Sequence, residues 1–205
     1  MGIFVTFEGM ECCGKSTQLH LLARWLRERG HDAIETREPG GTDIGESIRE
    51  LLRSGNVSGT FSSRAEILLF EASRAQHMEE KILPAIAAGK IVLCDRFHDS
   101  TTVYQGVARA VDADAVSFLN GFASHGRVPD MTILLDIGVR ESFRRMDARG
   151  AIRDRIESED ENFFQKVRDG YRMLAEDVRF FTVDGMSSIA EIHGKIRDEF
   201  ARRFF

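Results

Sequence analysis

One segment near the N-terminus has the residue types and spacing needed for phosphate chemistry. It reads Gly9-Met10-Glu11-Cys12-Cys13-Gly14-Lys15-Ser16-Thr17 and fits the phosphate-binding loop pattern G-x-x-x-x-G-K-[ST]. The apolar run Ile3–Phe7 precedes it, and apolar residues recur at helical spacing after it. A strand, a glycine loop and a helix start in this order aim backbone N–H groups at one point, which suits a polyphosphate. The pattern predicts that Lys15 reaches the β- and γ-phosphates of a nucleotide and that Ser16 binds Mg²⁺.

A second candidate for phosphate chemistry is Asp95-Arg96, directly after the apolar run Ile91–Cys94. An acidic residue that closes such a strand often holds Mg²⁺ through water in phosphate-loop proteins. Arg96 offers a planar fork for a phosphate group. The alternative is an ordinary surface ion pair between the two neighbours.

Two further segments suggest contacts with a nucleotide. Arg37-Glu38-Pro39-Gly40-Gly41-Thr42 forms a turn that permits close backbone approach, with Arg37 and Glu38 over the pocket; an ordinary strand-to-helix turn is the alternative. Phe70 and Arg74 are four residues apart on a predicted helix and share one face. Together they can stack on a base and donate to its carbonyl oxygen. A core phenylalanine with a solvated arginine is the alternative.

A row of arginines, Arg145, Arg149 and Arg153, recurs every four residues. One helical face of this kind can clamp a transferring phosphoryl group. It can also be a solvated face with ion pairs such as Glu141–Arg145 and Arg153–Glu157.

The elements that position these residues alternate between strands and helices. The predicted strands are Ile3–Phe7, Ala33–Thr36, Ile91–Cys94, Thr132–Asp136 and Phe180–Val183. The predicted helices are Ser16–Arg29, Ile44–Arg53, Ala65–Ala88, Val103–Ala108, Asp112–Ser124, Val139–Asp147, Asn162–Glu176 and Ile189–Arg203. This alternation predicts an α/β protein with a parallel sheet covered on both faces and a ligand beyond the carboxyl ends of its strands.

Length and composition narrow the function further. The 205 residues suit one domain, residues 1–205, and the net charge of −5 argues against general nucleic-acid binding. The three cysteines include no C-x-x-C pair, so neither a disulfide framework nor a zinc site is expected. No signal peptide and no membrane-spanning run is recognised, and a reducing cytoplasm is the expected compartment.

These segments, in this order, resemble the thymidylate kinase family of nucleoside monophosphate kinases. The matching segments are Phe7-Glu8-Gly9 with the loop, the turn at 37–42, residues 68–77, Asp95-Arg96-Phe97 with Asp99-Ser100, Tyr104-Gln105-Gly106, and residues 149–157. The Pro-Gly-Gly-Thr turn and the Tyr-Gln-Gly step distinguish this family from adenylate and guanylate kinases. The resemblance implies a P-loop NTPase fold, with a five-stranded parallel sheet flanked by helices and a short helical lid at about residues 147–160.

The resemblance also implies an activity, the ATP-dependent phosphorylation of dTMP to dTDP with Mg²⁺. Gly9 to Thr17 would bind ATP, and Ser16, Asp95 and Glu38 would hold or orient Mg²⁺. The implied catalytic residues are Lys15, Asp95, Arg96, Arg149 and Arg153. The implied dTMP-binding residues are Glu11 near the sugar 3′-hydroxyl, Arg37 and Arg96 on the phosphate, Phe70, Arg74, Ser100 and Gln105 on the base, and Tyr104 in the place of a ribose 2′-hydroxyl.

Cys12 occupies the position where some family members carry an arginine, so this chain resembles the type with basic residues in the lid. Cys12 and Cys13 depart from the small residues usual there, and Lys15 or the helix start could lower a thiol pKa. Small side chains turned away from the phosphates are the other interpretation. The family also suggests a homodimer packed through helices, for which the apolar residues of Ala65–Ala88 would suffice; a helix buried inside the monomer would look similar.

Three other functions remain open from the residues. A GTPase switch is disfavoured because neither an Asn-Lys-x-Asp motif nor a D-x-x-G after the third strand is recognised. The acceptor could be another monophosphate or a deoxynucleoside. A non-catalytic nucleotide-binding module is disfavoured by the intact Lys15, Ser16, Asp95 and Arg96.

Overall fold

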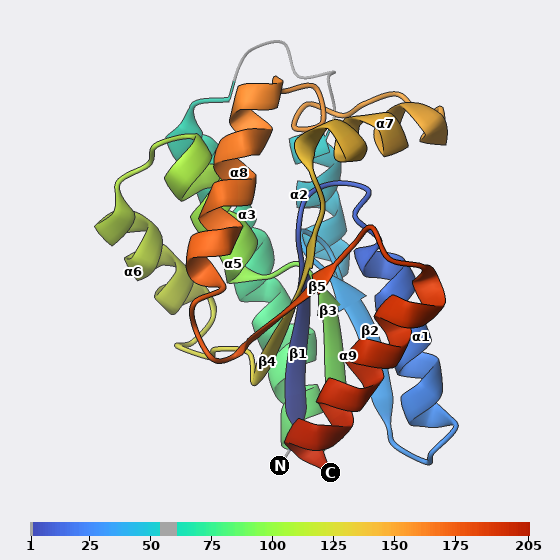
Figure 1. Cartoon of the computed structure of the whole chain (residues 1–205). Coiled ribbons are helices and arrows are strands. Elements are labelled where there is room, and N and C mark those ends of the chain that lie inside the picture. The colour runs from blue at the N-terminus through green and yellow to red at the C-terminus, as the bar shows by residue number, and fades with distance from the viewer. Residues whose placement is uncertain (1, 54–60) are drawn as a thin grey trace.

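The chain folds around one parallel sheet of five strands in the order β2-β3-β1-β4-β5 (Figure 1). The computed structural model describes residues 2–53 and 61–205. The strands are β1 (Ile3–Glu8), β2 (Ala33–Arg37), β3 (Ile91–Asp95), β4 (Met131–Asp136) and β5 (Phe180–Asp184). All four strand pairings are parallel. The expected five-stranded α/β architecture is therefore confirmed.

Helices cover both faces of the sheet, as a parallel sheet requires. Figure 1 shows α1 and α9 on one side and α3, α5 and α8 on the other. The helices are α1 (Lys15–Arg27), α2 (Asp43–Arg53), α3 (Ser63–His77), η1 (Met78–Ile82), α4 (Leu83–Ala87), α5 (His98–Thr101), η2 (Thr102–Ala108), α6 (Ala113–Ala123), α7 (Val139–Arg149), α8 (Glu161–Leu174) and α9 (Ile189–Phe204). Over residues 2–53 and 61–205, no helix is long and apolar enough to span a membrane.

The central strand β1 is buried on both faces, which explains its nearly continuous apolar sequence. Val5 and Phe7 pack in the larger core cluster with residues of α1 and α9. Phe4 faces the other way, into a smaller cluster that includes Met78 and Phe97. The strands β1, β2 and β3 each end in a charged residue, and this places Glu8, Arg37 and Asp95 at the carboxyl edge of the sheet.

One predicted helix is divided, and another begins earlier than predicted. The segment predicted as a single helix over Ala65–Ala88 consists of α3, the wider π-helical turn η1, and α4. Pro84 stands at the start of α4, and a proline ring displaces the carbonyl four residues earlier, which accounts for the widened turn. The helix predicted at Val103–Ala108 starts at His98 instead, as α5 followed directly by η2.

The segment of residues 147–160, called the lid segment below, was expected to be helical, and most of it is not. Helix α7 ends at Arg149 because Gly150 adopts the left-handed conformation (φ 68°) that stops helices. A short turn follows, in which the Asp154 side chain accepts hydrogen bonds from the backbone N–H groups of Ile156 and Glu157. The next helix, α8, begins at Glu161.

Candidate active site

The phosphate-binding loop lies between β1 and α1, as its pattern predicts, and its shape depends on glycine. Gly9 has φ 134°, and a Cβ atom there would lie 2.5 Å from the carbonyl oxygen of Leu135. Gly14, with φ 105°, turns the chain into α1. A side chain at Gly9 would therefore push the loop off β4 and spoil the backbone cradle.

Lys15, Ser16 and Asp95 are brought together at the mouth of this loop. The Lys15 Nζ is buried and donates to the backbone oxygens of Gly9 (3.0 Å) and Met10 (2.8 Å). The Ser16 hydroxyl donates to Asp95 Oδ2 at 2.5 Å, because β3 lies beside β1 and ends at the same edge. A hydroxyl and a carboxylate are hard oxygen donors, so this pair fits Mg²⁺ with phosphates and waters as its other ligands.

Neither loop cysteine shows the features of an activated thiol. Burial raises the pKa of Cys12 above its ordinary value, although the charge of Arg149 opposes this. Burial also raises the pKa of Cys13, whose Sγ would lie 2.9 Å from a Cβ at Gly9. Cys13 is buried, with an exposure of 1%.

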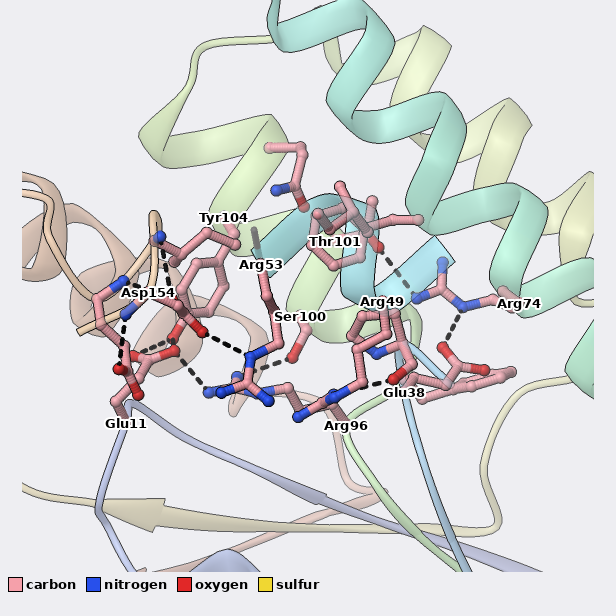
Figure 2. Close-up of a pocket in the computed structure, with 17 residues that line it drawn as sticks. Glu11, Glu38, Arg49, Arg53, Arg74, Arg96, Ser100, Thr101, Tyr104 and Asp154 are labelled. Carbon is pink, nitrogen blue, oxygen red and sulfur yellow. Dashed lines mark hydrogen bonds and ion pairs between the residues drawn. The ribbon is translucent and has the colours of Figure 1, made fainter. Parts of the chain in front are cut away.

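A cavity opens beside the loop, and Figure 2 shows the side chains that line it. Seven of the eight residues predicted to bind the acceptor lie in its wall: Glu11, Phe70, Arg74, Arg96, Ser100, Tyr104 and Gln105. Its other lining residues are Glu38, Pro39, Arg49, Leu52, Arg53, Phe97, Thr101, Asp154, Ile156 and Glu157. Elements far apart in the sequence thus build one cavity between the loop, α2, α3, α5 and the lid segment.

Arg96 lies at the centre of a polar network between the loop and the cavity. Its guanidinium donates to Glu11 Oε1 (2.8 Å) and to the Ser100 hydroxyl (3.1 Å). The Tyr104 hydroxyl donates to both Glu11 oxygens, at 2.9 and 2.7 Å. Glu11 therefore faces the cavity and is anchored there, as expected for a loop residue that serves the acceptor rather than ATP.

The other end of the cavity is built around Arg74, which is 2% exposed and so is not a solvated arginine. It donates to Glu38 (2.8 Å), Glu71 (2.5 Å), Asn120 (3.2 Å) and Thr101 (3.0 Å). Among the described residues, one of its five N–H groups is left for a ligand. Phe70 stands in the same wall, half-buried, with its ring available for stacking.

The predicted metal role of Glu38 does not agree with its surroundings. Its two oxygens accept from Arg74 (2.8 Å) and from His77 Nδ1 (3.1 Å). Burial raises its pKa, but the charges of Arg74 and His77 and their hydrogen bonds together outweigh burial, so the pKa lies below its ordinary value. The carboxylate is thus committed to holding Arg74 in place, which leaves Ser16 and Asp95 as the candidate Mg²⁺ ligands.

Arg37 is the predicted acceptor residue that does not line the cavity. Its guanidinium pairs with Glu46 in the first turn of α2 (2.8 Å), with about half of its side chain exposed (52%). It lies instead in a neighbouring groove with residues of α2 and the lid segment. The competing carboxylate of Glu46, nine residues further along the chain, draws Arg37 out of the predicted position.

Two residues that the sequence patterns did not single out take the place expected of Arg37. Arg49 and Arg53, one turn apart on α2, line the cavity beside Arg96. Figure 2 shows their guanidinium groups gathered together, with Arg74 set apart beside Glu38 and Thr101. Burial and the nearby charges of Arg53 and Arg37 lower the pKa of Arg49, as expected where several cations converge. The four-residue spacing of Arg49 and Arg53 was the available signal.

Glu8 is a third residue that sequence patterns did not assign to the site. Burial, together with the negative charge of Asp99, raises its pKa. It accepts hydrogen bonds from the Phe97 backbone N–H (2.8 Å), the Ser100 hydroxyl (2.7 Å) and the Tyr171 hydroxyl (2.7 Å). Glu8 therefore holds the segment from Phe97 to Ser100, directly after Arg96, which itself has φ 73°.

The arginine row divides into different environments. Arg149 lies over the loop, 4.0 Å from Cys12 Sγ, and pairs with both oxygens of Glu157 at 2.9 and 2.7 Å. Arg145 pairs with Glu141, as predicted, and also donates to the Cys12 carbonyl (3.4 Å).

Arg153 stacks on Phe143, with its cationic carbon 4.8 Å from the ring centre. The predicted Arg153–Glu157 pair is wrong: Arg153 binds Asp147 instead, because the helix ends at Arg149 and the four-residue spacing no longer applies.

The geometry thus combines a polyphosphate loop with an adjacent cavity that holds cations at one end and a flat ring with hydrogen-bonding groups at the other. Sequence comparison agrees with that arrangement. The sequence profile of the family described as "Thymidylate kinase" matches residues 7–196. The chain is 45% identical over 203 residues to a thymidylate kinase of Geotalea uraniireducens, covering 96% of this chain and 95% of that protein.

Other relatives give the same result. A thymidylate kinase of Sulfurihydrogenibium is 46% identical over 205 residues, with 99% of this chain and 98% of that protein covered. The crystal structure of thymidylate kinase from Ehrlichia chaffeensis superposes with a TM-score of 0.79 at 33% identity and covers 98% of both chains. The chain therefore belongs to the thymidylate kinase family.

Proposed function

We propose that this protein transfers the γ-phosphoryl group of ATP to dTMP, giving ADP and dTDP. One observation carries the proposal: the cluster of Arg49, Arg53 and Arg96 lies in a cavity beside a loop that already holds Lys15. A nucleoside monophosphate whose phosphate meets this cluster would present an oxygen toward a nucleotide bound in the loop. Membership of the thymidylate kinase family supports the acceptor assignment.

The proposed mechanism relies on placement and charge. An oxygen of the acceptor phosphate forms a bond to the γ-phosphorus. At the same time the bond between the γ-phosphorus and the oxygen that bridges the β- and γ-phosphates breaks, and ADP leaves with that electron pair. The acceptor is already an anion, so it needs no strong general base. Lys15, Arg96 and Arg149 would neutralise oxygens that gain charge in the transition state. Mg²⁺, held by Ser16 and Asp95, would supply further charge neutralisation.

The other end of the cavity would recognise the base and sugar. Phe70 would stack on thymine, Arg74 would donate to a thymine carbonyl, and Gln105 with Ser100 would bind the base edge. Tyr104 is 4% exposed and anchored on Glu11, so it would occupy the space that a ribose 2′-hydroxyl needs. Glu11 would then accept a hydrogen bond from the 3′-hydroxyl.

A panel of acceptors tests the proposed function. ADP release is followed with ATP and Mg²⁺ in the presence of each nucleoside monophosphate, thymidine, or the ribo form of dTMP. We expect turnover with dTMP to exceed turnover with purine monophosphates, thymidine and the ribo form by at least about tenfold each, the scale of a lost hydrogen bond or a steric clash. Equal rates with thymidine would indicate a nucleoside kinase, and no acceptor-dependent rate would indicate a binding module.

The lid arginines provide a second test, because the structure separates them. We expect Arg149→Ala to lower kcat about 10- to 100-fold, the scale for removing one transition-state donor. Arg153→Ala serves as the matched comparison and should lower kcat less, because Arg153 pairs with Asp147 away from the loop. Steady-state kinetics at saturating ATP and dTMP measures both. A larger loss in Arg153→Ala would reverse the assignment.

We also infer a homodimer and a cytoplasmic location. Ile67, Met78 and Ile82 of the predicted Ala65–Ala88 interface are buried in the monomer, so that helix alone is a poor interface. Leu68 on α3 and Phe118 and Phe122 on α6 are exposed by 55%, 71% and 73%, and these support a dimer face shared by α3 and α6. All three cysteines are free thiols, which suits a reducing compartment.

A further inference from the structure

We propose that Glu66 is a positioning residue that links the base-reading end of the cavity to the lid segment, with Gln105 on one carboxylate oxygen and Arg155 on the other. The link rests on the proposed acceptor site, because it gives Glu66 a role in presenting Gln105 to the base. It goes beyond that site by connecting acceptor binding with closure over the phosphate-binding loop.

Glu66 is a charged side chain fixed inside the protein. It lies on α3 and is 1% exposed. Its Oε1 accepts from Gln105 Nε2 at 2.8 Å and from Arg109 at 3.2 Å, and its Oε2 accepts from Arg155 at 2.5 Å. Burial raises the pKa of Glu66, but the hydrogen bond from Gln105 and the charges of Arg109 and Arg155 lower it further than burial raises it. The carboxylate is therefore ionised at neutral pH.

An ionised Glu66 determines which way the Gln105 amide points. A carboxylate accepts but does not donate, so the NH₂ group of Gln105 must face Glu66. The amide oxygen is then the group that Gln105 can offer to a ligand. Pyrimidines of the uracil and thymine type carry an N–H between two carbonyl groups, whereas cytosine has an unprotonated ring nitrogen there. Glu66 thus sets Gln105 to accept from a thymine-type base.

The second oxygen connects Glu66 to the lid segment. Arg155 lies in the turn of that segment, and its guanidinium also packs over the Phe61 ring at 5.0 Å. The neighbouring Glu157 accepts from the Asp154 backbone N–H (3.2 Å) and binds Arg149 through both oxygens. Arg149 in turn lies 4.0 Å from Cys12 in the loop. A chain of contacts thus runs from Gln105, which would contact the base, to Arg149, which lies over the phosphate-binding loop.

The arrangement can open without leaving a buried charge alone. When the lid segment lifts, Arg155 leaves Glu66 and Glu159 leaves Arg109 (2.7 Å). Arg109 directly follows η2, outside the lid segment, and keeps its contact with Glu66 at 3.2 Å. Stripping a buried carboxylate of its only cation is strongly unfavourable, so a second cation makes repeated opening feasible. The contact between Glu66 and Arg155 is thus suited to a reversible closure rather than to a permanent brace.

The link is tested by hydrogen exchange in the full-length chain without ATP. We expect saturating dTMP to slow amide exchange of residues 151–159 about five- to tenfold in the wild type, the lower range of coupling between two sites. In Arg155→Ala the slowing should vanish, and dTMP affinity measured by calorimetry should fall by the same factor, because coupling is reciprocal. Arg144→Ala is the matched control, because Arg144 is an exposed arginine on α7 paired with Glu141.

A double-variant cycle distinguishes the link from general destabilisation. Glu66→Gln should raise the KM for dTMP about tenfold more than it changes kcat, and adding Arg155→Ala should have little further effect. Circular dichroism and thermal melting verify that each variant folds. The link would be overturned if dTMP slowed amide exchange of the lid segment equally in the wild type and in Arg155→Ala. It would also be overturned if the effects of Glu66→Gln and Arg155→Ala on the KM for dTMP were additive. A wild type that does not bind dTMP would instead overturn the proposed function.

Discussion

Replacing Arg96 with alanine is expected to lower turnover by about 10³-fold, equivalent to about 4 kcal/mol of lost transition-state stabilisation. Arg96 is the cation placed between the loop residue Glu11 and the acceptor cavity. The acceptor phosphate must be held in line with the donor, and a planar guanidinium does this with two parallel hydrogen bonds. Steady-state kinetics with ATP and dTMP measures the loss.

The fold should survive this substitution. Glu11 loses one partner but keeps the Tyr104 hydroxyl on both oxygens. Ser100 and Tyr171 remain bonded to Glu8. The backbone at position 96 already carries a Cβ at φ 73°, so alanine adds no new backbone strain. Arg96→Lys keeps the positive charge but loses the planar fork of the guanidinium, so its turnover should lie between those of the wild type and Arg96→Ala. Near-normal turnover in Arg96→Ala, with the fold intact, would rule out the assigned role.

Lys15→Met should lower kcat by about 10²- to 10³-fold, because it alters the phosphate-binding loop, where ATP would bind. Methionine has a similar length without the charge, so the variant removes the cation that would contact the β- and γ-phosphates. The acceptor cavity does not include Lys15, and dTMP affinity measured by calorimetry should stay within about twofold of the wild type.

The two substitutions should both lower turnover but differ in dTMP affinity, since Arg96→Ala should weaken dTMP binding and Lys15→Met should not. The Gly9 and Met10 carbonyls lose their donor in Lys15→Met. If dTMP affinity fell as far as turnover, collapse of the loop rather than loss of charge would be the cause.

Residues that act within a continuous motif were predictable from the sequence. The loop, the Asp95-Arg96 strand end and the Tyr104-Gln105 step each carry their own spacing, and the parallel sheet brings strand ends to one edge. The family resemblance added which of these motifs would bind ATP and which would bind dTMP. The structure places seven of the eight predicted acceptor residues around one cavity.

Positions decided by competition between distant groups were not predictable. Arg37 pairs with Glu46 rather than entering the cavity, and Glu38 is engaged by Arg74 and His77. Nothing in the spacing of these residues tells which partner wins. The lid segment differs, because Gly150 after the last helical turn was a visible stop signal. Reading it would have separated Arg153 from the helical face of Arg145 and Arg149.

The anchoring of the lid segment bears on how products leave. Its stem, α7, rises from the loop side, yet its turn is tied to α2 by Arg53–Asp154 (3.2 Å) and to α3 by Arg155–Glu66. Both nucleotides would thus be enclosed by one segment fastened on the acceptor side. ADP and dTDP would share a single exit event, and the residence time of each product would depend on these ion pairs and on Arg109–Glu159 (2.7 Å). A compound that held those pairs closed would trap the enzyme with its products.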